Sequence, residues 1–266
     1  GHIRAVCVCC SRLLCLPHCI ALDSGGRVID MIEVYTGTVG SGKSYHALSR
    51  GLSRIRSIPD RYVIANFPIK AKTKKEKNRW LYFDNEEVTV SLLIKKSFEL
   101  GAYAHEGHSL IILDEAGIMF NSRDWQINGQ ARKEWIKFFS QSRKFGYDVI
   151  LVAQDMRMLD RQIRSLAEFE VKHVKANNYS LFKILPITAF FYVSFWSGGR
   201  FRGQMELGIL LPWVAKKYDT MKMFSMSDEV IEIARQYGYI PPIVPEIVPE
   251  QEEEGEGVPS PDAPVL

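Results

Sequence analysis

Short apolar runs alternate with amphipathic segments through the middle of the chain. Four of these runs are nearly continuous in apolar residues, which is typical of parallel strands buried on both faces. They lie at residues 31–35, 61–67, 110–115 and 148–154. Between the first two runs, Leu48, Leu52 and Ile55 recur at helical spacing within residues 43–58. Strands that alternate with helices predict an α/β fold built on a parallel sheet.

A second amphipathic stretch predicts a helix over residues 131–145. Trp135, Phe138 and Phe139 fall on one side of this helix, so we expect that side to pack against the sheet. Gly146 follows directly, and glycine commonly ends a helix because it adopts the left-handed conformation without strain.

The pattern changes toward β structure in the last third of the chain. Residues 169–174 alternate, residues 179–196 are apolar and aromatic, and Ser197–Arg200 has the composition of a hairpin turn that leads back through 201–211. This predicts an antiparallel β extension of the sheet. The apolar core at 184–196 is shorter than the roughly 20 residues that a membrane-spanning helix needs. Docking of the aromatic hairpin at a membrane surface is the alternative.

The two ends of the chain do not follow this organisation. Residues 1–30 hold all five cysteines and show no sustained period, so we interpret them as an extension outside the fold, with a zinc site as the alternative. The absence of cysteine elsewhere favours a reducing, cytoplasmic setting. We expect a main domain over 31–226, a short helix over 227–240, and a disordered acidic, proline-rich tail over 241–266.

Charge is informative only locally. The net charge of +3 is too small to attract nucleic acid or anionic lipid by itself. Residues 70–79, however, place six Lys and Arg residues around a single acid, Glu76. This basic segment is either a solvated loop or a contact for DNA phosphates or anionic lipid.

The candidate chemistry begins directly after the first apolar run. Gly37–Ser44 reads G-x-x-x-x-G-K-S, the phosphate-binding loop of nucleoside triphosphatases. Its glycines let backbone amides approach a triphosphate, Lys43 supplies a cation for the β- and γ-phosphates, and Ser44 offers a hydroxyl to Mg²⁺. A helix that begins here directs its N-terminal amides at the anion. The residues expected to bind nucleotide are Gly37, Thr38, Val39, Gly40, Ser41, Gly42, Lys43, Ser44 and Tyr45.

Two later apolar runs end in polar residues that suit the same chemistry. Asp114 is the candidate partner of Mg²⁺, directly or through a water, and Glu115 is the candidate base that polarises the attacking water. Gln154 is a candidate to hold that water or the γ-phosphate, although a polar residue simply leaving a strand is the alternative.

We favour ATP as the nucleotide because the chain has no Asn-Lys-x-Asp motif for guanine. An arginine from a neighbouring subunit often completes the stabilisation of the transition state in such sites. Arg143 is the first candidate for this role and Arg164 the second. Either residue is equally well interpreted as an ordinary surface arginine.

Four segments together resemble the zonular occludens toxin-like family, which includes the assembly ATPases of filamentous phages and is similar to the DNA-pumping ATPases of the FtsK and HerA type. The segments are 37–44, 113–116, 141–148 and 152–154. The resemblance covers about residues 31–224. It is most specific at 141–154, where an Arg-x-x-Gly-x-Asp segment leads into a strand that ends in Gln.

The resemblance implies an additional-strand P-loop fold, in which the strand ending at Gln154 lies between the loop strand and the Asp114 strand. It also implies homo-oligomeric rings, expected to be hexamers, that use ATP and Mg²⁺ to extrude phage single-stranded DNA and coat protein through the host inner membrane, with secretion proteins as partners. Family members usually carry a transmembrane helix after the ATPase domain. For this chain we expect a location in the host cytoplasm, peripheral to the inner membrane, with the anchor in a partner or in the aromatic hairpin.

Two other functions fit the same residues. A cytoplasmic DNA-translocating or packaging motor would use the basic segment at 70–79 to hold DNA phosphates. A nucleotide-gated scaffold would bind ATP to assemble coat or secretion proteins but would turn over little.

Overall fold

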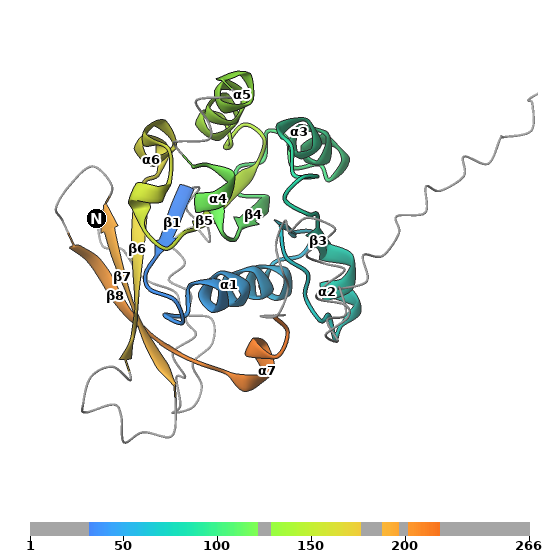
Figure 1. Cartoon of the computed structure of the whole chain (residues 1–266). Coiled ribbons are helices and arrows are strands. Elements are labelled where there is room, and N and C mark those ends of the chain that lie inside the picture. Colours follow the sequence, from blue (N-terminus) through green and yellow to red (C-terminus); the bar gives the residue numbers. More distant parts are fainter. Residues whose placement is uncertain (1–31, 122–128, 177–187, 197–201, 219–266) are drawn as a thin grey trace, which may run out of the picture. The chain divides into compact units, whose positions relative to one another are not determined.

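A computed structural model describes residues 32–121, 129–176, 188–196 and 202–218. The predictions for residues 1–30, 227–240 and 241–266, and the hairpin turn at Ser197–Arg200, lie outside these ranges. Within them, eight strands form one sheet in the order β3-β2-β4-β5-β1-β6-β7-β8 (Figure 1). The strands are β1 (Ile32–Thr36), β2 (Tyr62–Ala65), β3 (Trp80–Tyr82), β4 (Ser109–Leu113), β5 (Tyr147–Val152), β6 (Phe169–Lys175), β7 (Ala189–Trp196) and β8 (Arg202–Ile209).

The predicted position of β5 is confirmed. It pairs in parallel with β1 on one side and with β4 on the other, so that Tyr35 lies opposite Val152 and Leu113 lies opposite Leu151. The carboxyl ends of these three strands therefore meet at one edge of the sheet. This is the additional-strand arrangement of P-loop proteins, and it brings the segments that follow β1, β4 and β5 together.

Helices cover both faces of the sheet (Figure 1). The helix α1 (Lys43–Ser57) and the short helix α7 (Pro212–Ala215) lie on one face, and α3 (Val90–Glu99), α5 (Gly129–Ser140) and α6 (Arg161–Leu166) lie on the other. The remaining helical segments are α2 (Lys74–Arg79), α4 (Ala116–Met119) and the 3₁₀ turn η2 (Met156–Met158). No helix among the described residues has both the length and the apolar character that crossing a bilayer requires.

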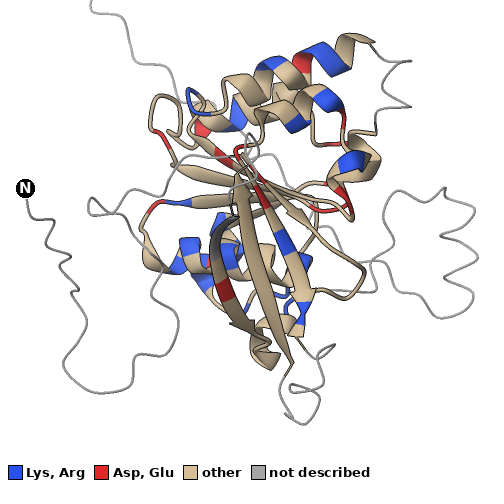
Figure 2. Ribbon diagram, turned by 90° about the vertical axis from the view of Figure 1, so that its left-hand side faces the viewer, with Lys and Arg blue, Asp and Glu red and all other residues tan. Residues whose placement is uncertain are grey.

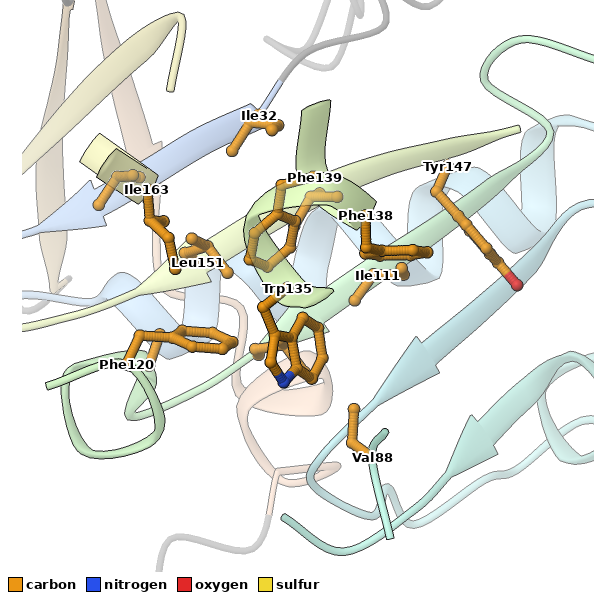
Figure 3. Packing of buried hydrophobic residues seen from close by; sticks show 14 of the residues in the cluster. Ile32, Val88, Ile111, Phe120, Trp135, Phe138, Phe139, Tyr147, Leu151 and Ile163 are labelled. Carbon is orange, nitrogen blue, oxygen red and sulfur yellow. The ribbon is translucent and has the colours of Figure 1, made fainter. Parts of the chain in front are cut away.

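The hydrophobic core has two parts, one on each face of the sheet. Alternate residues of the same strands face opposite ways, so Ile111 belongs to the α5 side and Ile112 to the α1 side. Figure 3 shows the α5 side, where the aromatic rings of α5 meet side chains from β4 and β5. Trp135, Phe138 and Phe139 are all buried there, which confirms the predicted packing side of this helix.

The predicted end of that helix is wrong. The helix stops at Ser140, and residues 141–146 form successive tight turns instead, with Gln141 N–H donating to Phe138 O and Gly146 N–H donating to Arg143 O. The turns let Ser142 become buried and let the chain reverse at once into β5. Tertiary packing at this corner therefore overrides the helical periodicity of the sequence.

The predicted antiparallel extension is confirmed. Strand β6 pairs in parallel with β1, β7 pairs antiparallel with β6, and β8 pairs antiparallel with β7. One face of this extension packs on α1 through Val171, Phe190 and Tyr192. The extension therefore continues the sheet beyond the loop strand and supports the loop from one side.

The basic segment at 70–79 is not simply a loop, because residues 74–79 form the helix α2. Thr73 caps this helix by accepting a hydrogen bond from Glu76 N–H, at 3.2 Å. Glu76 itself is fully buried, whereas the lysines of the segment are exposed. Figure 2 shows Lys and Arg residues on helices at both sides of the sheet, so basic residues are not confined to this segment.

Candidate functional site

The phosphate-binding loop connects β1 to α1, and the close packing around it explains its glycines. Gly37 has φ 144°, and a Cβ there would lie 2.5 Å from the His173 carbonyl oxygen. Gly42 precedes α1 with φ 90°, and a Cβ there would lie 2.8 Å from the Phe190 ring. A side chain at either position would displace the antiparallel extension or the loop.

The loop presents groups that fit a triphosphate. Thr38, Val39 and Gly40 are exposed, and the buried Ser41 hydroxyl has no hydrogen-bond partner among the described residues. The Lys43 ammonium donates to Gly37 O at 2.8 Å and to Thr38 O at 3.0 Å, so it lies inside the curve of the loop. Amides, a hydroxyl and an ammonium are the donor set that a phosphate chain requires.

Electrostatics connect this lysine to the two carboxylates predicted to act with it. Burial lowers the pKa of Lys43, whereas the charges of Asp114 and Glu115 act in the opposite direction. The sequence-predicted residues Lys43, Asp114 and Glu115 are therefore brought together by the strand order. Asp114 immediately follows β4, and Gly37 immediately follows β1, with β5 between them.

Asp114 is held by a residue that the sequence reasoning missed. The Asn66 side chain accepts from Asp114 N–H at 2.7 Å and donates to Asp114 O at 2.7 Å. Asn66 directly follows β2, the neighbour of β4, and is fully buried. A polar residue at the end of an apolar strand was the available signal, the same one that pointed to Gln154.

Glu115 occupies a strained position beside the metal-binding candidates. Its backbone has φ 54°, a left-handed conformation that is uncommon for a residue with a side chain, and its N–H donates to Asp114 Oδ1 at 2.8 Å. Partial burial and the charge of Asp114 raise the pKa of Glu115, whereas Lys43 lowers it. A carboxylate with a raised pKa is a better acceptor for the proton of an attacking water.

The Ser44 and Asp114 oxygens fit Mg²⁺ by their chemistry, since this ion prefers hydroxyl and carboxylate ligands. A second missed residue lies beside them. The Tyr218 hydroxyl donates to Asp114 Oδ2 at 2.7 Å, and the Ser44 side chain is close enough to the same phenol to affect its pKa. Tyr218 lies 104 positions after Asp114 in a stretch without a motif, so no sequence signal indicated it.

Two further predicted residues, Gln154 and Tyr45, differ in whether the structure brings them to the loop. Gln154 follows β5, its main-chain carbonyl accepts from Gly37 N–H at 3.1 Å, and its side chain is exposed. The Tyr45 hydroxyl is half-buried and donates to the carbonyl oxygen of Ile209, the last residue of β8, at 3.0 Å. The structure therefore brings Gln154 to the loop and turns the Tyr45 hydroxyl toward β8.

The two candidate arginines lie away from the loop. Arg143 precedes β5, at the opposite edge of the sheet from the loop, and pairs with Glu168 at 3.6 Å. Arg164 lies on α6, where it lines a cavity of about 490 Å³ with Arg161, Lys172 and Trp196. Both residues precede the amino end of a strand that runs parallel to β1, whereas the loop follows the carboxyl end of β1.

Two histidines, the buried His173 and the partly buried His46, support the loop from beneath. His173 Nδ1 lies 2.9 Å from Val171 O and 3.2 Å from Thr36 O, so this nitrogen carries the proton, and Nε2 accepts from His46 Nδ1 at 2.9 Å. Burial lowers the pKa of His173 to about 4 and lowers the pKa of His46 as well, so both rings are neutral. This pair joins β6 to α1 directly under the loop.

Comparisons with known proteins find relatives among phage proteins. The chain is 29% identical over 142 residues to the gene 1 protein of Enterobacteria phage M13, which covers 51% of this chain and 40% of that protein. It is 42% identical over 71 residues to the gene 1 protein of Enterobacteria phage I2-2, which covers 26% of this chain and 19% of that protein. The chain thus spans about two-fifths of the length of the M13 relative.

Among solved structures, the N-terminal domain of zonular occludens toxin from Neisseria meningitidis matches with a TM-score of 0.48 and 16% identity, over 72% of this chain and 100% of that chain. A model of the family described as zonular occludens toxin (Zot) matches residues 31–190, which is more than half of the sequence. The matched range holds the phosphate-binding loop, both carboxylates and Gln154. The chain belongs to the zonular occludens toxin family.

Proposed function

We propose that this protein hydrolyses ATP to drive the assembly and export of filamentous phage. The observation that carries the proposal is the convergence of Lys43, Ser44, Asp114 and Glu115 at the shared carboxyl edge of β1, β5 and β4. The similarity to gene 1 proteins of phages M13 and I2-2 supports the phage context. The export role rests on the family resemblance.

Each residue has a role that follows from its place. The loop amides and Lys43 hold the phosphates, and Ser44 with Asp114 would hold Mg²⁺, which neutralises charge on the β- and γ-phosphates. Glu115 takes a proton from a water whose oxygen attacks the γ-phosphorus, and the bond to the bridging oxygen breaks. Gln154 orients that water or the γ-phosphate.

The assembly state and the partners follow from the same resemblance. We propose a homo-oligomeric ring, a hexamer, at the cytoplasmic side of the host inner membrane, which passes single-stranded phage DNA and coat protein to secretion proteins. The position of Arg143 supports the ring, because a residue at the opposite edge of the sheet can serve only a neighbouring subunit's nucleotide. Residues 31–226 would form the motor domain, with 227–240 as a helix and 241–266 as a tail.

Phosphate release from ATP tests the assignment directly. We expect Lys43→Ala to weaken nucleotide binding and Glu115→Gln to lower the hydrolysis rate by about 100-fold or more, the usual contribution of a general base. Glu134→Gln, on the exposed side of α5, is the matched control and should hydrolyse at the parent rate. Parent-like rates in both site variants would show that the assigned site is wrong.

The exposed lysines at 70–77 favour a DNA-translocating motor as the second candidate. That motor would bind DNA with an affinity that falls steeply with salt, and replacing these lysines by Gln would reduce the salt dependence. A nucleotide-gated scaffold would instead bind ATP tightly and release negligible phosphate.

A further inference from the structure

The chain after β8 crosses the α1 side of the sheet as a segment, residues 210–218, that we call the strap. Its first residues are tied to the helix of the phosphate-binding loop, because the Tyr45 hydroxyl accepts from Leu211 N–H at 2.9 Å. Val214 in α7 is buried in the core on this side of the sheet. The strap is therefore a packed part of the domain.

The end of the strap has a buried ionic anchor. Lys217 is 3% exposed, and its ammonium pairs with the fully buried Glu76, which also accepts from Arg56 at 2.8 Å. Lys217 O accepts from Lys70 N–H at 2.9 Å. These bonds fix the backbone on which Tyr218 stands, while the Tyr218 ring packs edge-on against Phe67 with centroids 5.0 Å apart.

The Tyr218 ring, held by these contacts, directs its hydroxyl toward the residues that would hold the metal ion. Asp114 Oδ1 already accepts from Glu115 N–H, and Asp114 Oδ2 accepts from the Tyr218 hydroxyl at 2.7 Å. The Ser44 side chain is close enough to the same phenol to affect its pKa. Mg²⁺ lies about 2.1 Å from its oxygen ligands and needs near-octahedral space around itself. The phenol bonded to Asp114 Oδ2 therefore stands at one of the oxygens that would bind the ion.

We propose that Tyr218 competes with Mg²⁺ for Asp114 and Ser44, so that binding of the metal–nucleotide complex displaces the phenol and loosens the strap. The inference rests on the proposed nucleotide site and adds the residue that couples this site to the strap. Its physical basis is competition for one lone pair, because the lone pair of Oδ2 that accepts the phenol proton cannot bind Mg²⁺ at the same time.

Affinity measurements with and without metal test the competition. Binding of a fluorescent ATP analogue is measured in Mg²⁺ and in EDTA for the parent, for Tyr218→Phe, and for Tyr103→Phe as a control at an exposed ring. Tyr218→Phe keeps the packing on Phe67 and removes only the hydroxyl. We expect its affinity in Mg²⁺ to rise roughly 10-fold, the equivalent of one hydrogen bond to a charged group, with no change in EDTA. Unchanged or weaker binding in Mg²⁺ would overturn the competition.

Hydrogen exchange tests the displacement without using turnover. Adding Mg²⁺ and a non-hydrolysable ATP analogue should accelerate exchange at Lys70 and Leu211, whose amides bond to Lys217 O and to the Tyr45 hydroxyl. The analogue in EDTA should leave both amides as they are. Binding without faster exchange would defeat this inference alone, whereas a failure to bind any nucleotide would defeat the proposed function.

Discussion

Single residues at the loop are constrained by what the neighbouring strand places against them. Gly37 combines φ 144° with the His173 carbonyl oxygen 2.5 Å from the position of a Cβ. We expect Gly37→Ala to lower the free energy of unfolding by about 1–3 kcal/mol, because both the backbone strain and the backbone contact resist relaxation. Urea denaturation followed by circular dichroism measures the change.

Gly129→Ala provides the comparison for that substitution. Gly129 begins α5 with nothing within 4 Å of a Cβ and without a positive φ, so Ala should be neutral or slightly stabilising there. Equal effects at the two glycines would mean that the contact between the loop and β6 does not constrain Gly37.

The residues of the candidate site differ in how far the sequence alone could predict them. Gly37–Ser44 is a local motif, and Asp114, Glu115 and Gln154 stand at the ends of apolar runs, so each could be found from its own neighbours. Asn66 and Tyr218 reach Asp114 only because β2 lies beside β4 and because the strap returns across α1. Those contacts depend on tertiary placement, which no local pattern contains.

At the scale of elements, α2 and the strap hold each other through a buried ion pair. Burial raises the pKa of Glu76, but hydrogen bonds from Lys217 and Arg56 outweigh it and lower the pKa to about 2 from 4.5. The unfolded chain therefore binds a proton at higher pH than the folded chain does. The stabilisation is complete above about pH 4.5 and is lost as the pH falls toward 2.

This linkage predicts a pH-dependent stability that Glu76→Gln removes. We expect the parent's free energy of unfolding to fall between pH 4.5 and 2 more steeply than that of the variant. At neutral pH the variant should be less stable by about 3 kcal/mol, because it leaves the buried Lys217 uncompensated. The neutral pair His46 and His173 acts in a separate window, since His173 titrates near 4 in the folded chain and loses its contribution as the pH falls from 6.5.

Denaturation curves across pH 2–7 measure both windows, with Lys75→Gln as the control. Lys75 lies beside Glu76 on α2 but is exposed, so its replacement should change stability by less than about 0.5 kcal/mol. A parent-like slope below pH 4.5 in Glu76→Gln would show that another carboxylate carries the acid sensitivity.

Elements were easier to predict than their ends. The periodicity of Trp135, Phe138 and Phe139 identified α5 and its buried side, because those rings face the sheet in the folded chain. The helix ends at Ser140 rather than at 145 because hydrogen bonds at the corner before β5, such as Tyr147 N–H to Ser142 O, favour turns. The sequence of 70–79 left a solvated loop and a contact for phosphates or lipid open and did not predict α2, because the burial of Glu76 depends on the distant Lys217.

At the scale of the whole molecule, the sheet separates the candidate site from the candidate arginine. The loop follows the carboxyl end of β1, whereas Arg143 precedes the amino end of β5, which runs parallel to β1. A strand of six residues lies between Arg143 and Gln154 along the chain. In the proposed ring, Arg143 would therefore act on the nucleotide of the next subunit and not on that of its own chain.

Mixing two inactive variants distinguishes this arrangement from a surface arginine. We expect Arg143→Ala to lower ATP hydrolysis by roughly 1,000-fold while leaving nucleotide affinity nearly unchanged, and Lys43→Ala to be inactive because it lacks the phosphate contact. In a mixed ring, a Lys43→Ala subunit supplies Arg143 to an intact Lys43 site in its neighbour, so activity should return. Lys144→Ala, an exposed neighbour, should keep the parent rate. Mixtures that stay inactive would place Arg143 outside the shared site, because complementation requires each subunit to contribute what the other lacks.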